Sequence, residues 1–130
     1  MIGSTKTRPL VILLEHNPTW AILLKEFLED YFSVVAAANF EEARRVAAQR
    51  ETAFVILPFN LESVLFAEES RSTKFKIIAI AESSYQKQYH LPPDSPIDCV
   101  LEKPHDDKTI ASLHNFFATL KQALLVPVTL

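Results

Sequence analysis

The sequence predicts an α/β domain with a parallel sheet that helices cover on both faces. Right-handed crossovers connect the strands of this sheet. Five short apolar runs recur along the chain, and segments with helical spacing of apolar residues separate most of them. These runs do not alternate with polar residues, which is typical of strands buried on both faces. The chain has 130 residues, 48% hydrophobic and 22% charged, so it can enclose one globular core.

The first quarter of the domain predicts one strand and one helix. Residues 10–14 are a short apolar run and form the first expected strand. A helix is expected from Thr19 to about Tyr31, because apolar residues recur there at helical spacing. These residues are Trp20, Leu23, Leu24, Phe27 and Leu28.

A second strand and helix follow. The strand is expected over residues 33–38, although its alanines have low strand propensity. Asn39 and Glu42, three residues apart, resemble a capping pair, which predicts a helix from there to about Arg50.

The middle of the chain predicts two more strands, over residues 53–57 and 76–81, with a short helix over residues 62–70 between them. Residues 83–90 can form two helical turns at most, because prolines follow at positions 92, 93 and 96. The rhythm of alternating strands and helices is therefore interrupted after the fourth strand.

The last part of the domain predicts a short fifth strand over residues 99–101 and a long helix from Asp106 to about Leu125. One side of this helix is apolar. The residues on that side are Ile110, Leu113, Phe116, Phe117, Leu120 and Leu124. We divide the chain into a loose leader (1–8), one folded domain (9–125) and a tail (126–130).

Composition argues against several classes of function. The net charge of −3 provides no basic surface for direct binding of nucleic acid. The apolar runs are far shorter than the roughly 20 residues that cross a bilayer, and no signal peptide precedes them, so we expect a cytoplasmic protein without membrane contact. Cys99 is the only cysteine, which excludes an intrachain disulfide and argues against a cysteine-based metal site.

Three segments at strand ends resemble the receiver domain of two-component response regulators. Residues 53–61 resemble its third strand, Glu15-His16-Asn17-Pro18 is similar to its acidic pair with Asn and Pro, and Lys103-Pro104 matches its lysine and proline after the fifth strand. The resemblance covers residues 9–125. It implies a flavodoxin-like (βα)5 three-layer sandwich with strand order 2-1-3-4-5.

The same resemblance indicates that the phosphorylation chemistry of receivers is missing. Pro58 stands where the phosphoacceptor aspartate is expected, and proline has neither a nucleophile nor a backbone donor. Receivers bind magnesium with two acids after the first strand, of which Glu15 remains and His16 replaces the other.

The positions that couple phosphorylation to conformational change in receivers differ as well. Ala81 stands where a threonine or serine binds the phosphoryl group, and Val100 where an aromatic residue changes rotamer. Lys103, which contacts the phosphoryl group in receivers, is retained, and in that family the peptide bond before the following proline is often cis. These departures predict a degenerate receiver, or pseudo-receiver.

The retained polar residues each have a structural and a functional interpretation. For Glu15, an ion pair with Lys103 is favoured over a metal ligand, because one carboxylate and one imidazole make a poor magnesium site. For His16, helix capping or hydrogen bonding is favoured over metal binding or phosphorylation. For Lys103, an ion pair is favoured over an anion site, and we expect no metal and no cofactor.

Aromatic residues of two segments are candidates for an interaction surface. Phe116 and Phe117 of the last helix are expected in the core in preference to an interface. For Tyr85, Tyr89 and His90, partner contact and ordinary packing are equally favoured. In the resembling family, the fourth and fifth strands and the last helix form a common dimer and partner face.

These observations favour a phosphorylation-independent protein interaction module in bacterial two-component-type signalling or regulation. Its partner would be a kinase, an output domain or a second copy of the chain. We do not expect an enzyme, because no nucleophile and base occur at a credible spacing and no Gly-rich phosphate loop is present. The alternative is a sensor of a small molecule or anion, which would bind around Lys103 and His16 at the carboxyl ends of the strands.

Overall fold

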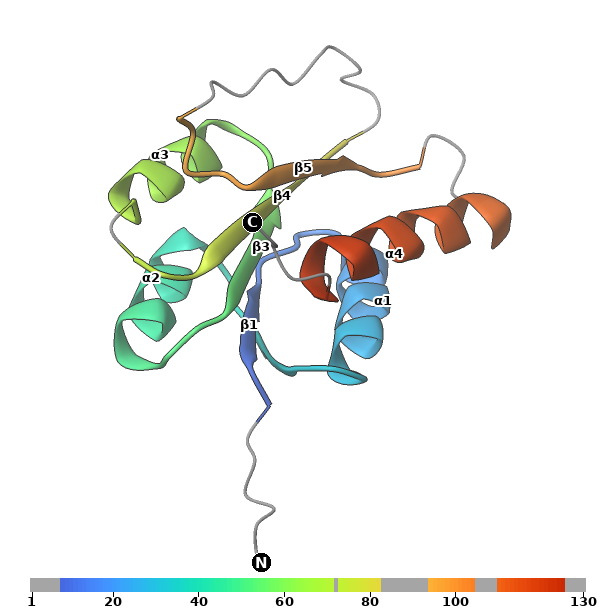
Figure 1. The fold of residues 1–130 in the computed structure, drawn as a ribbon, viewed down its shortest axis with the longest axis horizontal. Helices are drawn as coiled ribbons and strands as arrows, with labels where there is room; N and C mark the ends of the chain where they lie inside the picture. The colour runs from blue at the N-terminus through green and yellow to red at the C-terminus, as the bar shows by residue number, and fades with distance from the viewer. Residues whose placement is uncertain (1–7, 72, 83–93, 105–109, 126–130) are drawn as a thin grey trace, which may run out of the picture.

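The computed structural model describes residues 8–71, 73–82, 94–104 and 110–125. The elements are β1 (Leu10–Leu13), α1 (Pro18–Glu29), β2 (Ser33–Ala36), α2 (Phe40–Gln49), β3 (Phe54–Pro58), α3 (Leu61–Glu69), β4 (Lys76–Ala81), β5 (Cys99–Glu102) and α4 (Ile110–Leu125). All strand pairs are parallel and their order is β2-β1-β3-β4-β5. Helices α1 and α4 lie on one side of the sheet, and α2 and α3 on the other (Figure 1). The predicted fold class and strand order are confirmed.

The core has two apolar layers, one on each face of the sheet. Val11 and Leu13 of β1 belong to the layer under α1 and α4. Ile12 and Leu14 belong to the layer under α2 and α3. Because β1 has covered faces on both sides, all its side chains are buried, and this explains why the strand runs in the sequence do not alternate with polar residues.

The first two strands end earlier than predicted, β1 at Leu13 and β2 at Ala36. β2 is an edge strand that pairs only with β1, so it stops where β1 stops. The last hydrogen bond runs from the amide of Ala37 to the carbonyl of Leu13, over 2.8 Å. The amide of Ala38 instead donates to the carboxylate of Glu42 in α2, over 2.7 Å.

The third strand is shifted by one residue from the predicted range, because Pro58 is its last residue and lies opposite Ile80 of β4. On the β4 side, the amide of Phe59 donates to the Ile80 carbonyl. On the β1 side, the last hydrogen bond is from the Leu14 amide to the Ile56 carbonyl. Pro58 has no N–H to continue that ladder, and the end of a strand is a position where a proline is tolerated.

Asparagine caps begin the first three helices. The side-chain oxygens of Asn17, Asn39 and Asn60 accept amide hydrogens of the first turns of α1, α2 and α3 at 2.8–3.0 Å. The predicted start of α2 at Asn39 is confirmed. Asn60 forms a full capping box with Ser63, which places the start of α3 one residue before the prediction.

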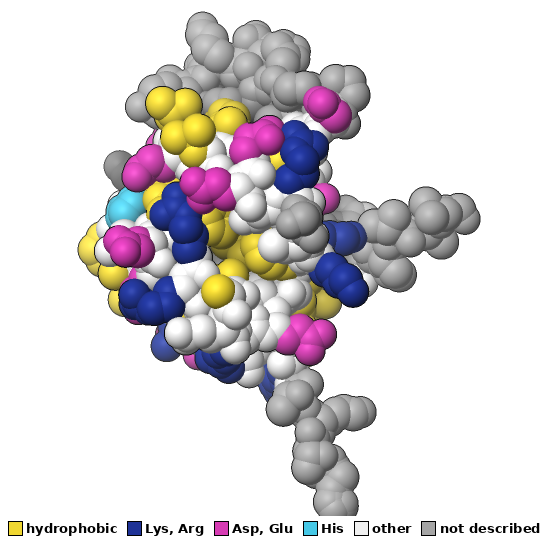
Figure 2. All heavy atoms as spheres, turned by 90° about the vertical axis from the view of Figure 1, so that its left-hand side faces the viewer, with side chains coloured by type: hydrophobic (Ala, Val, Ile, Leu, Met, Phe, Trp, Pro, Cys, Tyr) yellow, Lys and Arg dark blue, Asp and Glu magenta, His cyan; other side chains and the backbone are white. Residues whose placement is uncertain are grey.

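The outer surface of α2 and α3 carries interspersed charges of both signs, and Figure 2 shows this side of the molecule. Arg44 of α2 forms an ion pair with Glu69 of α3 over 2.7 Å, and Arg71 pairs with Glu68 over 2.8 Å. These side chains are about half exposed, so each pair contributes at most about 1 kcal/mol. The same side of the molecule also exposes three large apolar side chains of α3, those of Leu61, Val64 and Leu65.

No described helix is both long and apolar enough to cross a bilayer. The predicted helical turns over 83–90, the prolines at 92 and 93, and the first residues of the predicted last helix, 106–109, lie outside the described residues. So do residues 1–7 of the predicted leader and the predicted tail, 126–130.

Candidate functional site

Three charged residues meet where the strands end at one edge of the sheet. Glu15 follows β1, Glu82 follows β4 and Lys103 follows β5. In a parallel sheet all carboxyl ends lie at the same edge, which is where folds of this kind bind ligands. The backbone of Lys103 is fixed there by a hydrogen bond from its amide to the carbonyl of Ala81, over 2.9 Å.

The ammonium group of Lys103 contacts both carboxylates. Its Nζ lies 3.2 Å from Oε2 of Glu15 and 2.9 Å from Oε2 of Glu82. The Lys103 and Glu15 side chains are each 7% exposed, whereas the Glu82 side chain is 58% exposed. The ion pair of Glu15 with Lys103 that the sequence predicts is therefore present and buried. The more exposed carboxylate of Glu82 is a second partner of the same ammonium.

Two further contacts complete the surroundings of this pair. Lys103 Nζ lies 5.3 Å from the centroid of the Trp20 ring, which attracts a cation through its electron-rich face. The Glu15 carboxylate also accepts the amide of Asn17 over 2.9 Å. The three N–H donors of the lysine thus have two carboxylates and an aromatic face as partners. The ammonium of Lys103 thus already has two carboxylates as partners, which does not favour a bound anion.

Glu82 was not identified from the sequence. The sequence does contain a signal for it, because an acidic residue directly after a predicted strand must lie at the same edge of the sheet as Glu15 and Lys103. The resemblance points instead to Ala81, one residue earlier, which stands at a position that binds the phosphoryl group in receivers.

The magnesium site that the resemblance implies does not fit the residues present. Among the described residues, no group of three or more His, Cys, Asp and Glu side chains is arranged to hold a metal ion. The Glu15 carboxylate contacts Lys103 and the Asn17 amide, which leaves it poorly placed to bind a cation. His16 is exposed. The residue that caps α1 is Asn17, so of the two roles expected for His16, helix capping or hydrogen bonding, helix capping is wrong.

The remaining positions of the degenerate site are apolar. Pro58 ends the central strand β3, and Ala81 is the buried last residue of β4. Val100 of β5 is half-buried and packs against the layer under α2 and α3. The peptide bond between Lys103 and Pro104 is trans.

The aromatic residues of α4 differ in their surroundings. Phe116 is buried and packs edge-to-face on Trp20, with ring centroids 5.2 Å apart; its expected place in the core is confirmed. Phe117 is half-buried, and its ring centroid lies 4.9 Å from that of Phe27 in α1. The other candidate contact residues, Tyr85, Tyr89 and His90, lie outside the described residues.

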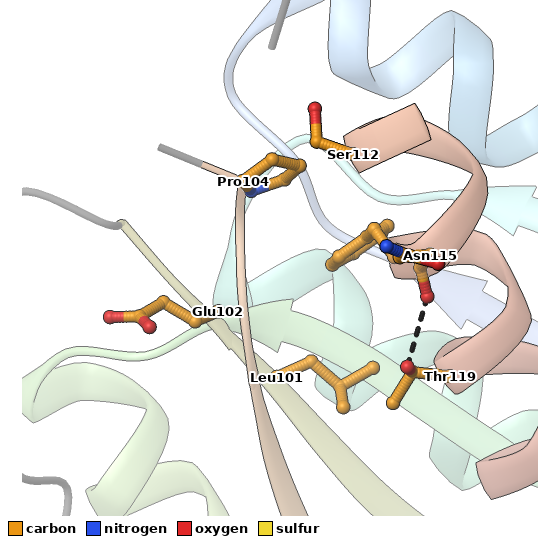
Figure 3. A pocket seen from close by; sticks show the side chains of 7 residues that line it. Leu101, Glu102, Pro104, Ser112, Asn115 and Thr119 are labelled. Carbon is orange, nitrogen blue, oxygen red and sulfur yellow. Dashed lines mark hydrogen bonds between the residues drawn. The ribbon is translucent and has the colours of Figure 1, made fainter. Parts of the chain in front are cut away.

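A groove of about 420 Å³ runs between β5 and α4 (Figure 3). In this view the Leu101 side chain points toward α4 and the Glu102 carboxylate points away from it. The Thr119 hydroxyl is turned back to its own helix, where it donates to the carbonyl of Asn115 over 2.9 Å. Of the residues that line this groove, the sequence singled out Phe116, as a residue of the core or of an interface, and Pro104, as part of the Lys103-Pro104 motif. The full lining is Leu101, Glu102, Pro104, Ser112, Asn115, Phe116 and Thr119.

Comparison with models of known protein families finds no match, and comparison with curated protein sequences finds none either. Solved structures do match. The response-regulator receiver domain (CheY-like) from Methylobacillus flagellatus is 21% identical with a TM-score of 0.61, over 88% of this chain and 99% of that one. A two-component response regulator from Clostridium difficile is 20% identical with a TM-score of 0.66, over 90% and 96%.

A third similar structure is that of CheY6 from R. sphaeroides, in complex with the P1 domain of CheA3. It is 20% identical with a TM-score of 0.66, over 93% of this chain and 99% of the matched chain. At these identities the comparisons show the fold alone. This chain has the fold of response-regulator receiver domains, in agreement with the predicted resemblance.

Proposed function

We propose that this chain is a receiver-fold protein interaction module of two-component-type signalling that works without aspartyl phosphorylation. The observation that carries this proposal is Pro58 at the end of the central strand β3. Phosphoryl transfer to a receiver requires a carboxylate nucleophile at that point. Proline supplies no atom that can form an acyl phosphate.

The charged cluster supports the same proposal. Lys103 is the one residue retained from the phosphoryl-binding set, and both Glu15 and Glu82 contact its ammonium group. A phosphoryl group would have to compete with two carboxylates that are already within 3.2 Å of Nζ. The lysine thus has a structural role, in which it ties the ends of β1, β4 and β5 together.

A small-molecule sensor is not favoured. It would use His16 and Lys103, but the ammonium of Lys103 is engaged by carboxylates and His16 is exposed. Five hollows on the described surface have other residues in their walls, and neither His16 nor Lys103 lines any of them.

Protein partners fit this fold and surface better than other ligands. CheY6, which shares the fold, is known in complex with the P1 domain of CheA3. Here the groove between β5 and α4 is lined by apolar and uncharged polar side chains apart from Glu102, whose carboxylate points away from α4 (Figure 3). The candidates are a kinase, an output domain and a second copy of the chain. We propose no catalytic activity and no nucleic-acid ligand.

The test is a phosphorylation challenge. The chain is incubated with magnesium and either acetyl phosphate or beryllofluoride, and a receiver that has its aspartate is treated in parallel. We expect no mass increase from acetyl phosphate, and no amide NMR shifts around Glu15, Pro58 and Lys103 with beryllofluoride. A magnesium-dependent acyl phosphate, or shifts that cluster at those residues, would overturn the proposal.

A further inference from the structure

Helix α3 exposes apolar side chains that its packing against the sheet does not require. Leu61 is 74% exposed, Leu65 is 52% exposed and Val64 is 37% exposed. The buried side of the helix is formed by other residues, namely Ser63, Phe66 and Ala67. Polar residues at the three exposed positions would leave this buried side unchanged, so the apolar side chains there need an explanation outside the core.

These three side chains form one contiguous surface, which we call the α3 patch (Leu61, Val64 and Leu65). Residues three and four positions apart are neighbours on a helix, so Leu61 lies beside both of the others. The other large apolar side chains exposed in the described part of the chain, Ile22 and Leu125, belong to two different helices on the other side of the sheet. Single exposed apolar residues are ordinary, whereas a contiguous apolar patch among polar side chains is typical of an interaction site.

Carboxylates border the α3 patch at the edge of the sheet where the strands end. Each helix begins after the carboxyl end of a strand, so the first turns of α2 and α3 lie at this edge. They carry Glu41 and Glu62, and Glu82 follows β4. We call these three residues the acidic rim.

Contacts in the structure place the acidic rim beside α3. Phe40, next to Glu41, lies 6.0 Å from Phe66 of α3 between ring centroids. The amide of Phe59, two residues before Leu61, donates to the carbonyl of Ile80, two residues before Glu82, over 2.8 Å. The start of α3 is therefore flanked by an acidic residue on each side and carries a third of its own.

Cations offset little of this charge. Among the described residues, Glu41 and Glu62 have no ion-pair partner. Lys103, which contacts Glu82, is 7% exposed and also contacts Glu15. At the other end of α3 the carboxylates are paired, Glu68 with Arg71 and Glu69 with Arg44. The α3 patch thus has an excess of negative charge at its first turn and balanced charges at its last turn.

We propose that the α3 patch binds a partner protein through a cationic amphipathic helix. The apolar side of this helix covers the patch, and its Lys or Arg side chains approach Glu62 and the rest of the acidic rim. Leu61 and Leu65 form a ridge with i, i+4 spacing, which can pack into the groove between the side-chain rows of another helix. The proposal names the surface and the partner chemistry of the interaction module proposed above and rests on that function. It places the contact on the side of the sheet opposite to α4 (Figure 1).

The charges argue against two other occupants of the patch. The charged residues of α3 are three glutamates and no cation. Two copies that met through their α3 helices around a two-fold axis would therefore set carboxylates against carboxylates. The same carboxylates would be repelled by anionic lipid headgroups, which attract basic surfaces instead. A partner segment with Lys and Arg beside its apolar residues is complementary to both features of this surface.

A pair of synthetic peptides tests this chemistry. The cationic probe is a helical peptide of about five turns, with Leu at helical spacing on one side and Lys at the flanking positions. The anionic probe has Glu in place of every Lys. We expect fluorescence anisotropy to show that the cationic peptide binds at least about tenfold more tightly than the anionic one, with an affinity that falls as salt is added. Amide NMR shifts of the chain should cluster in α3.

Two substitutions, each with a matched control, locate the binding. Leu65→Gln removes an apolar contact without adding charge and should weaken binding of the cationic peptide about tenfold or more. Ile22→Gln is its control, because Ile22 is 59% exposed in α1 on the other side of the sheet. Glu62→Gln should weaken binding and reduce its salt dependence, whereas Glu26→Gln, at an exposed position of α1, should change neither. Circular dichroism and urea unfolding check that all four variants are folded.

Several outcomes would overturn the proposal. They are the absence of binding up to about 1 mM cationic peptide, equal affinities for the two peptides, and binding that Leu65→Gln leaves unchanged. Sedimentation equilibrium that shows self-association of the wild type, lost in Leu65→Gln, would assign the patch to a second copy instead. Peptide binding that appears only after a Gly-Ser linker replaces residues 83–93 would assign it to the chain itself. Both of these results also contradict a partner protein as the occupant.

The result is separable from the phosphorylation challenge. A chain that resists acetyl phosphate but does not bind the cationic peptide removes the α3 patch as the partner surface and leaves the proposed interaction module intact. A chain that binds the peptide through Leu65 and accepts a phosphoryl group does the reverse.

Discussion

Replacement of Lys103 by methionine should destabilise the fold, because it leaves the buried carboxylate of Glu15 without its cation. Methionine keeps the length and apolar stem of the side chain but removes the ammonium. At 3.2 Å, and with an effective dielectric constant of about 20, two unit charges interact by about 5 kcal/mol. Desolvation of the pair offsets much of this attraction in the wild type. In the variant, Glu15 stays buried with the Asn17 amide as its remaining hydrogen-bond donor, so we expect a loss of about 3–5 kcal/mol.

A double-mutant cycle separates the interaction energy of the Glu15–Lys103 pair from the contributions of the two single side chains. Glu15→Gln together with Lys103→Met removes both charges, and we expect it to recover most of the loss, because neutral groups of similar volume are tolerated at buried pairs. Glu82→Gln is the exposed control and should cost less than about 1 kcal/mol. Urea unfolding is measured for the wild type, Glu15→Gln, Lys103→Met, the double variant and Glu82→Gln. With a slope of about 1–3 kcal/mol/M, the midpoint for Lys103→Met should fall by about 1 M or more.

Two outcomes would refute this reasoning. The first is a decrease of less than about 1 kcal/mol in the free energy of unfolding for Lys103→Met, which would mean that the Glu15 carboxylate binds water or another partner. The second is a double variant as unstable as the sum of its single changes, which would mean that the two side chains do not interact.

Two further predictions concern the layer under α1 and α4. Phe116→Ala should lower the free energy of unfolding by about 3–5 kcal/mol, because the ring is buried against Trp20. The Phe117 ring is half-buried, so Phe117→Ala should cost clearly less. Thermal unfolding ranks the two variants, and the opposite order would contradict the packing. The pKa of the Cys99 thiol is raised, first by burial and second by Asp98. The native state therefore holds this proton to higher pH than the unfolded chain does, so stability should fall as pH rises past the ordinary thiol pKa of 9.0. Alkylation of Cys99 by iodoacetamide near that pH should be slower in the native protein than in urea, and equal rates would contradict a half-buried thiol.

The sequence determined the fold class, because local signals and the global architecture agree. Apolar runs without alternation require a sheet covered on both faces, and in such a sheet all strands end at one edge. The pairing of Glu15 with Lys103 follows from that rule, although 88 residues separate them in the chain. The absence of a nucleophile at Pro58 is equally a property of the sequence, since no arrangement in space gives proline a carboxylate.

The tertiary structure decided which side chains share a contact and where each strand stops. Glu82 joins Lys103, and Asn17 caps α1 in place of His16, because distances of a few ångströms depend on backbone positions set by the whole sheet. Strand β2 ends at Ala36 because its single neighbour ends there. The outward side of α4 has no signature in the sequence, because the same helical periodicity gives an apolar side whether the opposite side meets water or a partner. Its grooves exist only because α1 and β5 pack beside it, and these are long-range contacts that no local pattern encodes.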